Sequence, residues 1–422
     1  MRTRTLISLV ALACAAALSC NKDGDFDLRP GGSGSSQVTP RTDIPEDSFN
    51  KVFLMVSGGY NDLNSYISED QRDMREGYLP GCLPEEKDVM VILSRLKWAN
   101  VTAPVLYRMS RMEDGSVRCD TLHRWATDMR LFDADVIHDA MQMVHNRFPA
   151  RSYGMAVSSH ATGWMPEKFY YYNRPPGAAA AVPARRSIGQ DGDGAEATEL
   201  DVQAFINAIP YKLDYLLLDC CLCGGVEVAW GLRGKADLVG FSQTEILADG
   251  FDYKKIGQRL LGGSAPDARA VCEDYFAQYD NPNGSATISL IDTREMDDLA
   301  DVCTTLFAKY RTALDNLDGS DDWDGQKVQG YFRFERHYFY DLEDILLKVG
   351  ITEEEHAQFT AALNRCVLYK AHTEWFMRSS LYGFPIKIHS GFSMYLPSMG
   401  TEYLNNYYKA NITWNQATHL VQ

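Results

Sequence analysis

The sequence lacks a lysine- or arginine-rich block, and acidic residues outnumber basic ones. Asp and Glu number 57 against 41 Lys and Arg, which gives the 422-residue chain a formal net charge of −16. Proteins that bind nucleic acid or an anionic membrane face concentrate positive charge on one surface. The charge balance therefore disfavours nucleic acid and anionic membranes as partners. It is compatible with polypeptide substrates but does not identify one.

The chain also lacks the evenly spaced cysteine framework of a small disulfide-stabilised domain. Of its ten cysteines, two lie near the N-terminus, three lie within four residues, and the other five are scattered. With 45% hydrophobic residues over this length, the chain can bury a large core without crosslinks. We expect mostly buried free thiols and at most one disulfide.

The apolar run at the N-terminus is too short to span a bilayer as a mature helix. Two arginines precede this run, residues 6–18, as in a secretory signal. It ends in Ala-Leu-Ser-Cys, residues 17–20, which resembles a bacterial lipobox, and the acidic residues that follow are similar to surface-export tags of Bacteroidetes lipoproteins. We predict a signal peptide over 1–20, lipidation of Cys20 and an outer-membrane or cell-surface location. Ordinary secretion with an incidental Cys20 is the alternative.

Residues 21–48 are rich in Gly, Ser, Pro and Asp, which is typical of a flexible linker. Over 49–262, apolar runs alternate with amphipathic segments such as Asp133–Phe148. The candidate strands are Val52–Val56, Val89–Leu93, Val105–Met109, Tyr153–Ser159, Leu213–Leu218 and Leu238–Phe241. Nearly continuous apolar strands joined by helices predict an α/β domain with a mostly parallel sheet covered on both faces. Residues 263–422 predict a smaller, mainly helical subdomain packed on that sheet, with one late strand over Gly391–Leu396.

Two candidate strands end in residues that their own packing does not require. His160 follows one strand, and Cys221 follows another through Asp219 and Cys220. Ligands bind at the carboxyl ends of strands in open α/β sheets, so neighbouring strands would place imidazole and thiol in one crevice. Amides at a strand-to-helix turn favour a thiolate, and an imidazole can protonate a leaving amine. The placement therefore suits covalent hydrolysis of an amide bond.

Three other readings of these cysteines stay open from the residues alone. Cys221 is a structural thiol if it is simply buried. Cys221 and Cys223 could be two zinc ligands, although no second pair follows at finger or ribbon spacing. Cys220 and Cys223 have the Cys-x-x-Cys spacing of a redox site, which would leave His160 unexplained.

At these residues the chain resembles the clostripain family of cysteine peptidases, in the clan of caspases, gingipains and legumain. The family pattern His-x-x-Gly-Trp is matched by residues 160–164, and Asp-x-Cys is matched by 219–221. The likeness extends to 59–63, 242–245 and 391–397, and it covers roughly residue 50 to the end.

The resemblance implies a caspase-like sheet, with His160 as general acid/base and Cys221 as nucleophile. It also implies that the backbone N–H groups of Ala161 and Cys221 stabilise the oxyanion, and that Asp219 helps to form the S1 pocket. Many members have Gly where this chain has Ala161, and often Met where it has Cys223.

Characterised relatives cleave after Arg or Lys by means of a carboxylate in S1. Asp249 is our candidate for that carboxylate, and a turn residue before Gly250 is the alternative. Relatives also cut themselves between the two motifs, which makes Arg185 or Arg186 in the 163–200 loop a candidate site, unless they are a solvated basic pair.

Some relatives respond to calcium, but the Asp-Gly-Asp-Gly run at 191–194 lacks the ligand spacing and terminal Glu of an EF-hand. The resemblance keeps calcium as a possible ligand, but we assign no metal site and expect no other cofactor. The sequence predicts a monomeric cysteine endopeptidase on a lipid anchor that acts on polypeptides and not on nucleic acid. A non-catalytic surface-binding lipoprotein of the same fold is the alternative, favoured by Ala161 and the crowded cysteines.

Overall fold

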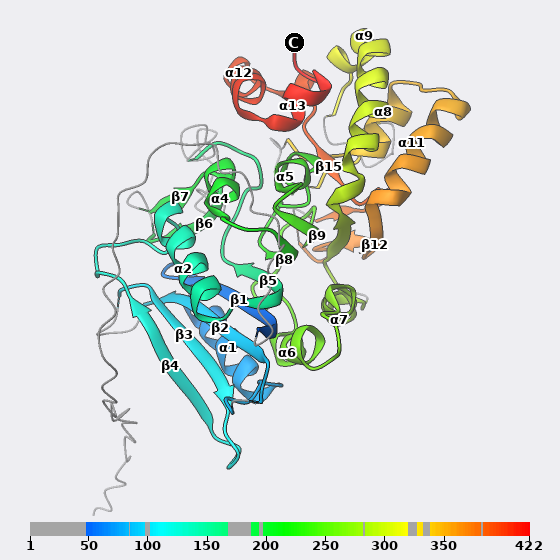
Figure 1. Cartoon of the computed structure of the whole chain (residues 1–422). Helices are drawn as coiled ribbons and strands as arrows, with labels where there is room; N and C mark the ends of the chain where they lie inside the picture. The colour runs from blue at the N-terminus through cyan, green and yellow to red at the C-terminus, as the bar shows by residue number, and fades with distance from the viewer. Residues whose placement is uncertain are drawn as a thin grey trace, which may run out of the picture. The chain divides into compact units, whose positions relative to one another are not determined.

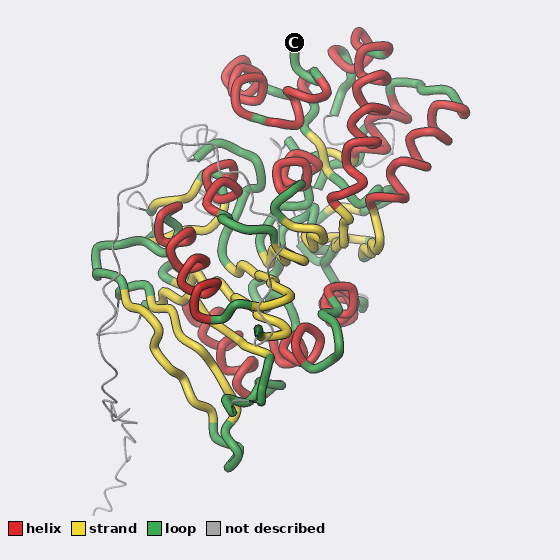
Figure 2. Tube along the Cα trace, in the orientation of Figure 1, coloured by secondary structure: helices red, strands yellow, loops and turns green. Residues whose placement is uncertain are grey.

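Short apolar runs of the sequence form one nine-stranded sheet (Figures 1 and 2). Its strands in spatial order are β12 (Val367–His372), β10 (Thr287–Asp292), β9 (Ala236–Phe241), β8 (Leu213–Asp219), β5 (Ala150–Ser158), β1 (Phe49–Gly59), β2 (Asp88–Leu96), β3 (Val105–Arg111) and β4 (Val117–Arg124). The central strands from β9 to β2 are mutually parallel, and antiparallel pairs extend the sheet at both edges. The predicted α/β fold with a mostly parallel sheet is confirmed.

The computed structural model describes residues 48–422 apart from 84, 98–101, 168–186, 194–196, 282, 320–326, 332–337 and 381–382. The predicted signal peptide, Cys20 and nearly all of the predicted linker lie outside the described residues. No helix in the described part has the length and apolar character needed to cross a membrane. The described residues belong to one unit, Val38–Gln422, and the predicted boundary at residue 262 stays a prediction.

Alternate residues of each central strand enter two cores on opposite faces of the sheet. On β1, Val52 and Leu54 pack on one face, and Phe53 and Met55 pack on the other. The first face is covered by α2 (Ala134–Arg147), α4 (Val202–Ala208), α5 (Val226–Leu232), α8 (Met296–Lys309) and α11 (Glu353–Cys366), the second by α1 (Asn64–Glu76), α6 (Tyr253–Leu261) and α7 (Ala268–Tyr279) (Figure 1). Burial on both faces explains why these strands are apolar almost throughout.

All six predicted strands lie in this sheet, and the predicted helix Asp133–Phe148 is α2, with Asp133 as its N-cap. The structure adds β4, β10 and β12, of which β10 and β12 come from the segment expected to be mainly helical. β12 is an edge strand whose residues are exposed or half-buried, and its apolar run is only the three residues Val367, Leu368 and Tyr369. The late strand is shorter than predicted, since only β15 (Ser393–Met394) is extended, paired with β11 (Tyr340–Asp341).

The remaining elements lie outside the nine-stranded sheet. They are β6 (Ile188–Asp191), β7 (Thr198–Leu200), α9 (Arg311–Asp315), α10 (Leu342–Lys348), β13 (Trp375–Phe376), β14 (Phe384–Pro385), α12 (Glu402–Asn411), α13 (Thr413–Thr418) and the short 3₁₀ turns Thr293–Glu295 and Pro397–Met399.

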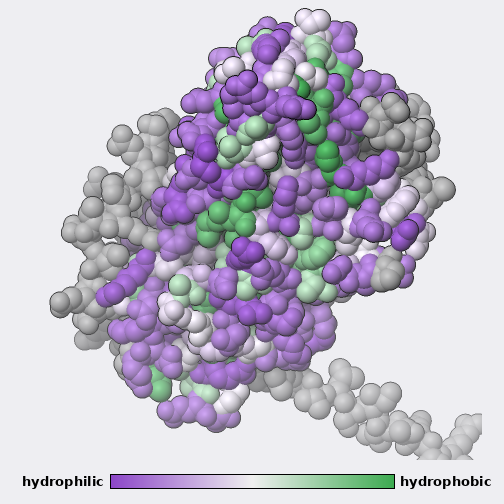
Figure 3. Space-filling model, turned by 90° about the vertical axis from the view of Figure 1, so that its right-hand side faces the viewer, coloured by the Kyte–Doolittle hydropathy of each residue, from purple (hydrophilic) through white to green (hydrophobic). Residues whose placement is uncertain are grey.

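Few large apolar side chains reach the surface of the described part. The face in Figure 3 is mostly hydrophilic with small hydrophobic patches, and the exposed large side chains are Tyr66, Leu83, Leu347, Leu368 and Tyr403. The described cysteines are all free, and five of the eight are buried, in line with the expected thiols.

Candidate active site

The strands that precede His160 and Cys221 are neighbours. β5 and β8 run parallel, and Ser158 on β5 pairs with Asp219 on β8. His160 and Cys221 each follow two residues beyond this pair, so both lie at the carboxyl edge of the sheet. The sheet topology thus shows that the two strands are neighbours, which the sequence alone did not establish.

The turn after His160 packs directly on the turn that carries Cys221. Gly163 has a φ of +60°, and a Cβ at this position would lie 2.3 Å from the carbonyl oxygen of Leu222. Leu222 has a φ of +59°, a conformation that non-glycine residues rarely adopt. Its N–H donates to the carbonyl of Thr244 at 3.0 Å, which fixes the residue after Cys221. The glycine of His-x-x-Gly-Trp is therefore required for both its conformation and this close approach.

The other stretches matched to the family hold the same turn from two sides. The N–H of Gly224 donates to the carbonyl of Ser242 at 2.7 Å, and the N–H of Ser393 donates to the carbonyl of Gly224 at 2.8 Å. The Gln243 side chain donates to the carbonyl of Gly391 at 2.7 Å. Segments far apart in the sequence thus converge on the turn that presents Cys221.

The three adjacent thiols differ in their access to solvent. Cys220 and Cys223 are 1% and 0% exposed, whereas Cys221 is partly exposed. Burial, together with the neighbouring Cys223, raises the pKa of Cys220 well above its usual value. A reacting thiolate must be ionised and reach its substrate. Of the three, Cys221 alone meets the access requirement, and the neutral, buried Cys220 argues against the redox reading.

His160 is hydrogen-bonded to a carboxylate that the sequence analysis did not single out. Its Nε2 lies 2.5 Å from Oδ1 of Asp62, which is 70% exposed, whereas the imidazole is 7% exposed. Asn61 positions this loop, because its amide donates to the carbonyls of Gly58 at 3.0 Å and Gln190 at 2.8 Å. A carboxylate so placed orients the ring and favours the imidazolium. The available signal was an Asn-Asp pair just after a strand.

Replacing Asp62 by Asn should lower kcat about tenfold and leave KM nearly unchanged, since Asp62 acts on His160 and not on substrate. The effect is moderate because water screens an exposed carboxylate. Loss of the carboxylate destabilises the imidazolium, so the alkaline limb of the kcat–pH profile should move to lower pH. An unmoved profile, matching the exposed control Asp301→Asn, would show that the contact has no catalytic effect.

Asp219 is buried and held by hydrogen bonds beside the turn that follows Cys221. The Tyr253 hydroxyl donates to its Oδ2 at 2.6 Å, and the Phe251 N–H donates at 3.4 Å. Burial raises the pKa of Asp219 to about 6, and these hydrogen bonds oppose the rise. Gly250 has a φ of +59°, and a Cβ there would lie 2.4 Å from Asp219 Oδ2. The turn that carries Asp249 is thereby brought against Asp219.

Asp249 is an exposed residue of a hydrogen-bonded turn, in which the Gly250 N–H donates to the carbonyl of Leu247 at 2.9 Å. The turn role considered from the sequence is therefore real. Asp249 is at the same time close enough to the buried Asp70 and Tyr279 to raise the pKa of each. A role in the turn and a role as an S1 carboxylate are therefore compatible for Asp249.

Ala161 forms a short antiparallel bridge with Ile188. The bridge uses the N–H groups of Thr162 and Gly189, which donate to Ser187 and His160 at 3.0 and 2.8 Å. No residue in the described ranges accepts a hydrogen bond from the Ala161 N–H, which fits the donor role implied for it. Arg185 and Arg186 lie outside the described residues.

The Asp-Gly-Asp-Gly run is engaged in ion pairs. Asp191 lies 3.2 Å from Arg95, both buried, and Asp193 pairs with Lys97. Within the part of the chain that the structure describes, no group of three or more His, Cys, Asp or Glu residues is arranged to hold a metal ion.

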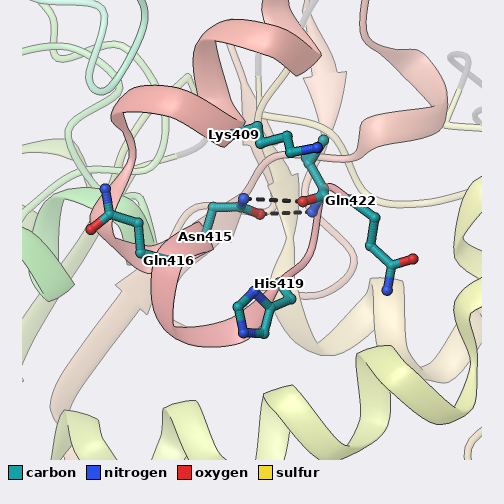
Figure 4. Close-up of a pocket in the computed structure, with 6 residues that line it drawn as sticks. Lys409, Asn415, Gln416, His419 and Gln422 are labelled. Carbon is teal, nitrogen blue, oxygen red and sulfur yellow. Dashed lines mark hydrogen bonds between the residues drawn. The ribbon is translucent and has the colours of Figure 1, made fainter.

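A separate depression near the C-terminus has none of this chemistry. It is lined by Lys409, Asn415, Gln416, His419, Val421 and Gln422 (Figure 4). The Asn415 side chain donates to the carbonyl of Val421 at 3.1 Å and accepts from its N–H at 2.7 Å. These bonds fasten the end of the chain, so we assign the depression a structural role.

Comparison with known proteins identifies the family and the fold. The clostripain family model matches residues 55–419. The fold is similar to that of an inactive zymogen C11 protease from Parabacteroides distasonis, with 26% identity, a TM-score of 0.70, and 89% of this chain and 99% of that chain covered. A secreted C11 cysteine protease from Bacteroides thetaiotaomicron, in complex with an irreversible peptide inhibitor, has 21% identity and a TM-score of 0.70, with 88% and 99% covered. No curated protein matches.

Proposed function

Because the chain belongs to the clostripain family of cysteine peptidases, we propose that it is an endopeptidase that cleaves after Arg or Lys. Cys221 is the nucleophile and His160 the general acid/base. The observation that carries the proposal is the position of these two residues at the carboxyl ends of neighbouring strands, beside the carboxyl group of Asp219.

The chemistry follows the order of a covalent hydrolysis. The Cys221 thiolate attacks the scissile carbonyl carbon, and the N–H groups of Ala161 and Cys221 stabilise the oxyanion. His160 protonates the leaving amine, which departs and leaves an acyl-enzyme. A water molecule, deprotonated by His160, then attacks the thioester and releases the acid and the thiol. The Asp62 carboxylate supports the imidazolium at each transfer.

Selectivity for a basic P1 side chain comes from carboxylates beside Cys221. Asp219 is buried and becomes negative above about pH 6, so it contributes negative charge from the interior beside the turn that carries Cys221. Asp249 offers a second carboxylate at the solvent side. Opposite charge in a partly desolvated pocket favours Arg and Lys over neutral side chains of similar length.

We further propose self-cleavage after Arg185 or Arg186 and export as a Cys20 lipoprotein without a metal cofactor. Ser187, the residue after Arg186, is buried and accepts the hydrogen bond of Thr162 next to His160. The cleaved segment would thus begin beside the catalytic residues. A neighbouring structure of the same fold is a secreted protease, which supports export.

A peptide panel that differs only at P1 tests the proposal. The wild-type protein should cleave Arg and Lys substrates and discriminate against citrulline and norleucine. Asp249→Ala should lower kcat/KM for the basic substrates about tenfold and leave the neutral ones unchanged, because it removes charge and not the nucleophile.

The matched control is Asp301→Ala, which removes an exposed aspartate on α8. Retention of the full basic preference in Asp249→Ala would leave Asp249 with its turn role only. A folded protein, cut in the 163–200 loop, that cleaves no peptide would favour the non-catalytic surface-binding lipoprotein.

A further inference from the structure

Asp70 is a largely buried aspartate whose side chain has no hydrogen-bond or ion-pair partner among the residues that the structure describes. It lies on α1, which packs against α6, the helix that begins with Tyr253. The residue is 6% exposed. No hydrogen bond or ion pair joins its side chain to any residue within the described ranges. Burial of a polar group costs free energy unless it is hydrogen-bonded or paired, so this position needs an explanation other than fold stability.

The groups that act on Asp70 are acidic and belong to the site already described. Asp219 on β8, Asp73 on α1 and Asp249 in the turn before α6 raise its pKa, after the larger effect of burial, to about 9. Asp70 in turn acts on the hydroxyls of Tyr253 and Tyr279. The side chain therefore lies on the same side of the sheet as the carboxyl groups of the S1 pocket, and it is neutral near pH 7.

A metal ion is a poor candidate for the partner of the Asp70 carboxyl group. Hard cations require several oxygen ligands around one point, and no cluster of that kind exists among the described residues. Carboxyl groups that extend from the exposed Asp249 to the buried Asp219 and Asp70 fit a long, flexible side chain with a charge at its end. Lysine and arginine have this form.

We propose that Asp70 is a specificity-determining carboxylate of the S1 pocket and binds the cationic end of a basic P1 side chain. The inference rests on the proposed preference for Arg or Lys. When the cation enters, Asp70 loses its proton to solvent and forms the ion pair that the free protein lacks. The unpaired carboxyl group lowers the stability of the free enzyme, and the same group selects the substrate.

Replacing Asp70 by Asn tests the proposal without changing the size of the side chain. We expect kcat/KM for Arg and Lys substrates to fall on the order of 100-fold, since a buried charge partner is lost. The citrulline substrate should change less than about twofold. Glu69→Gln is the control, because Glu69 precedes Asp70 on the same helix and is exposed.

The thermal stability of the unliganded variant gives a second, independent readout. The pKa of Asp70 is raised on folding, so its contribution to stability is lost as pH rises from about 4 to about 9. Asp70→Asn should remove this loss and melt at a higher temperature than wild type at pH 8. Tyr253 and Tyr279, whose pKa values are raised, stay neutral in this range, and Asp73, Asp219 and Asp249 are present in both proteins.

The outcomes separate the inference from the function on which it rests. If wild type prefers basic P1 residues and Asp70→Asn behaves like Glu69→Gln, the inference is overturned and the proposed function stands. If Asp70→Asn loses activity equally on all substrates and melts lower, Asp70 is structural. A wild-type enzyme that prefers neutral P1 residues overturns both.

Discussion

Replacing Cys221 by Ala is expected to abolish peptide hydrolysis, whereas Cys220→Ala and Cys223→Ala should keep most of it. The covalent route has no substitute nucleophile, so the loss should reach at least about 10⁴-fold in kcat. Cys220 and Cys223 are buried on either side of Cys221 and cannot reach a peptide without unfolding the turn. A fluorogenic Arg substrate, with the concentration of each folded protein set by its absorbance, measures the difference.

The two control variants also test the competing readings of the cysteine cluster. Each removes one sulfur from a packed interior, so both should be destabilised by about 1–2 kcal/mol and remain folded. Within this cluster an alkylating reagent should modify Cys221 before Cys220 and Cys223, because it is the accessible thiol of the three, and peptide mapping separates it from the exposed Cys119. Hydrolysis that survives in Cys221→Ala, or a disulfide-exchange activity lost in Cys220→Ala and Cys223→Ala, would contradict the assignment.

The positions of His160 and Cys221 at strand ends could be predicted from the sequence, because their strands are apolar almost throughout. Their proximity could not, since it depends on β5 and β8 being adjacent in the sheet order. The choice among three cysteines likewise came from a family pattern. Burial gives an independent physical reason for it, because neighbouring residues in a turn face different environments.

Asp62 and Asp70 were missed for two different reasons. Asp62 is an exposed loop residue whose role appears only when the loop after β1 is placed beside His160. Asp70 lies in a helix of strongly polar sequence, where one more aspartate attracts no notice. It lies on α1, which packs against α6, and most strands of the sheet separate these two helices in the sequence. Local periodicity contains no information on such long-range contacts.

The strands of the C-terminal half were missed because they are short and lie among helical segments. β12 is an edge strand, and its alternating residues stay partly accessible. β10 pairs antiparallel with β9 and β12 and is completely buried, but it follows a helix closely and is only six residues long. In such short segments, tertiary pairing decides the conformation more than intrinsic preference does.

Substituting Ala for Gly163 should lower kcat/KM about 100-fold or more while the protein stays folded. The new Cβ would lie 2.3 Å from the Leu222 carbonyl oxygen, and backbone on both sides must shift to relieve this contact. The shift separates the turn after His160 from the turn that carries Cys221. A displacement of about 1 Å between reacting groups is enough for a loss of this size.

Gly234→Ala is the matched control for this substitution. Gly234 also has a positive φ, +81°, but no heavy atom lies within 4 Å of the position of its added Cβ. Both variants carry the conformational cost of a side chain in the left-handed region, so their melting temperatures report that shared cost. The excess loss of activity in Gly163→Ala then measures the contact between the two turns alone. If both variants retain similar kcat/KM, the close approach of the turns does not set the geometry of His160 and Cys221.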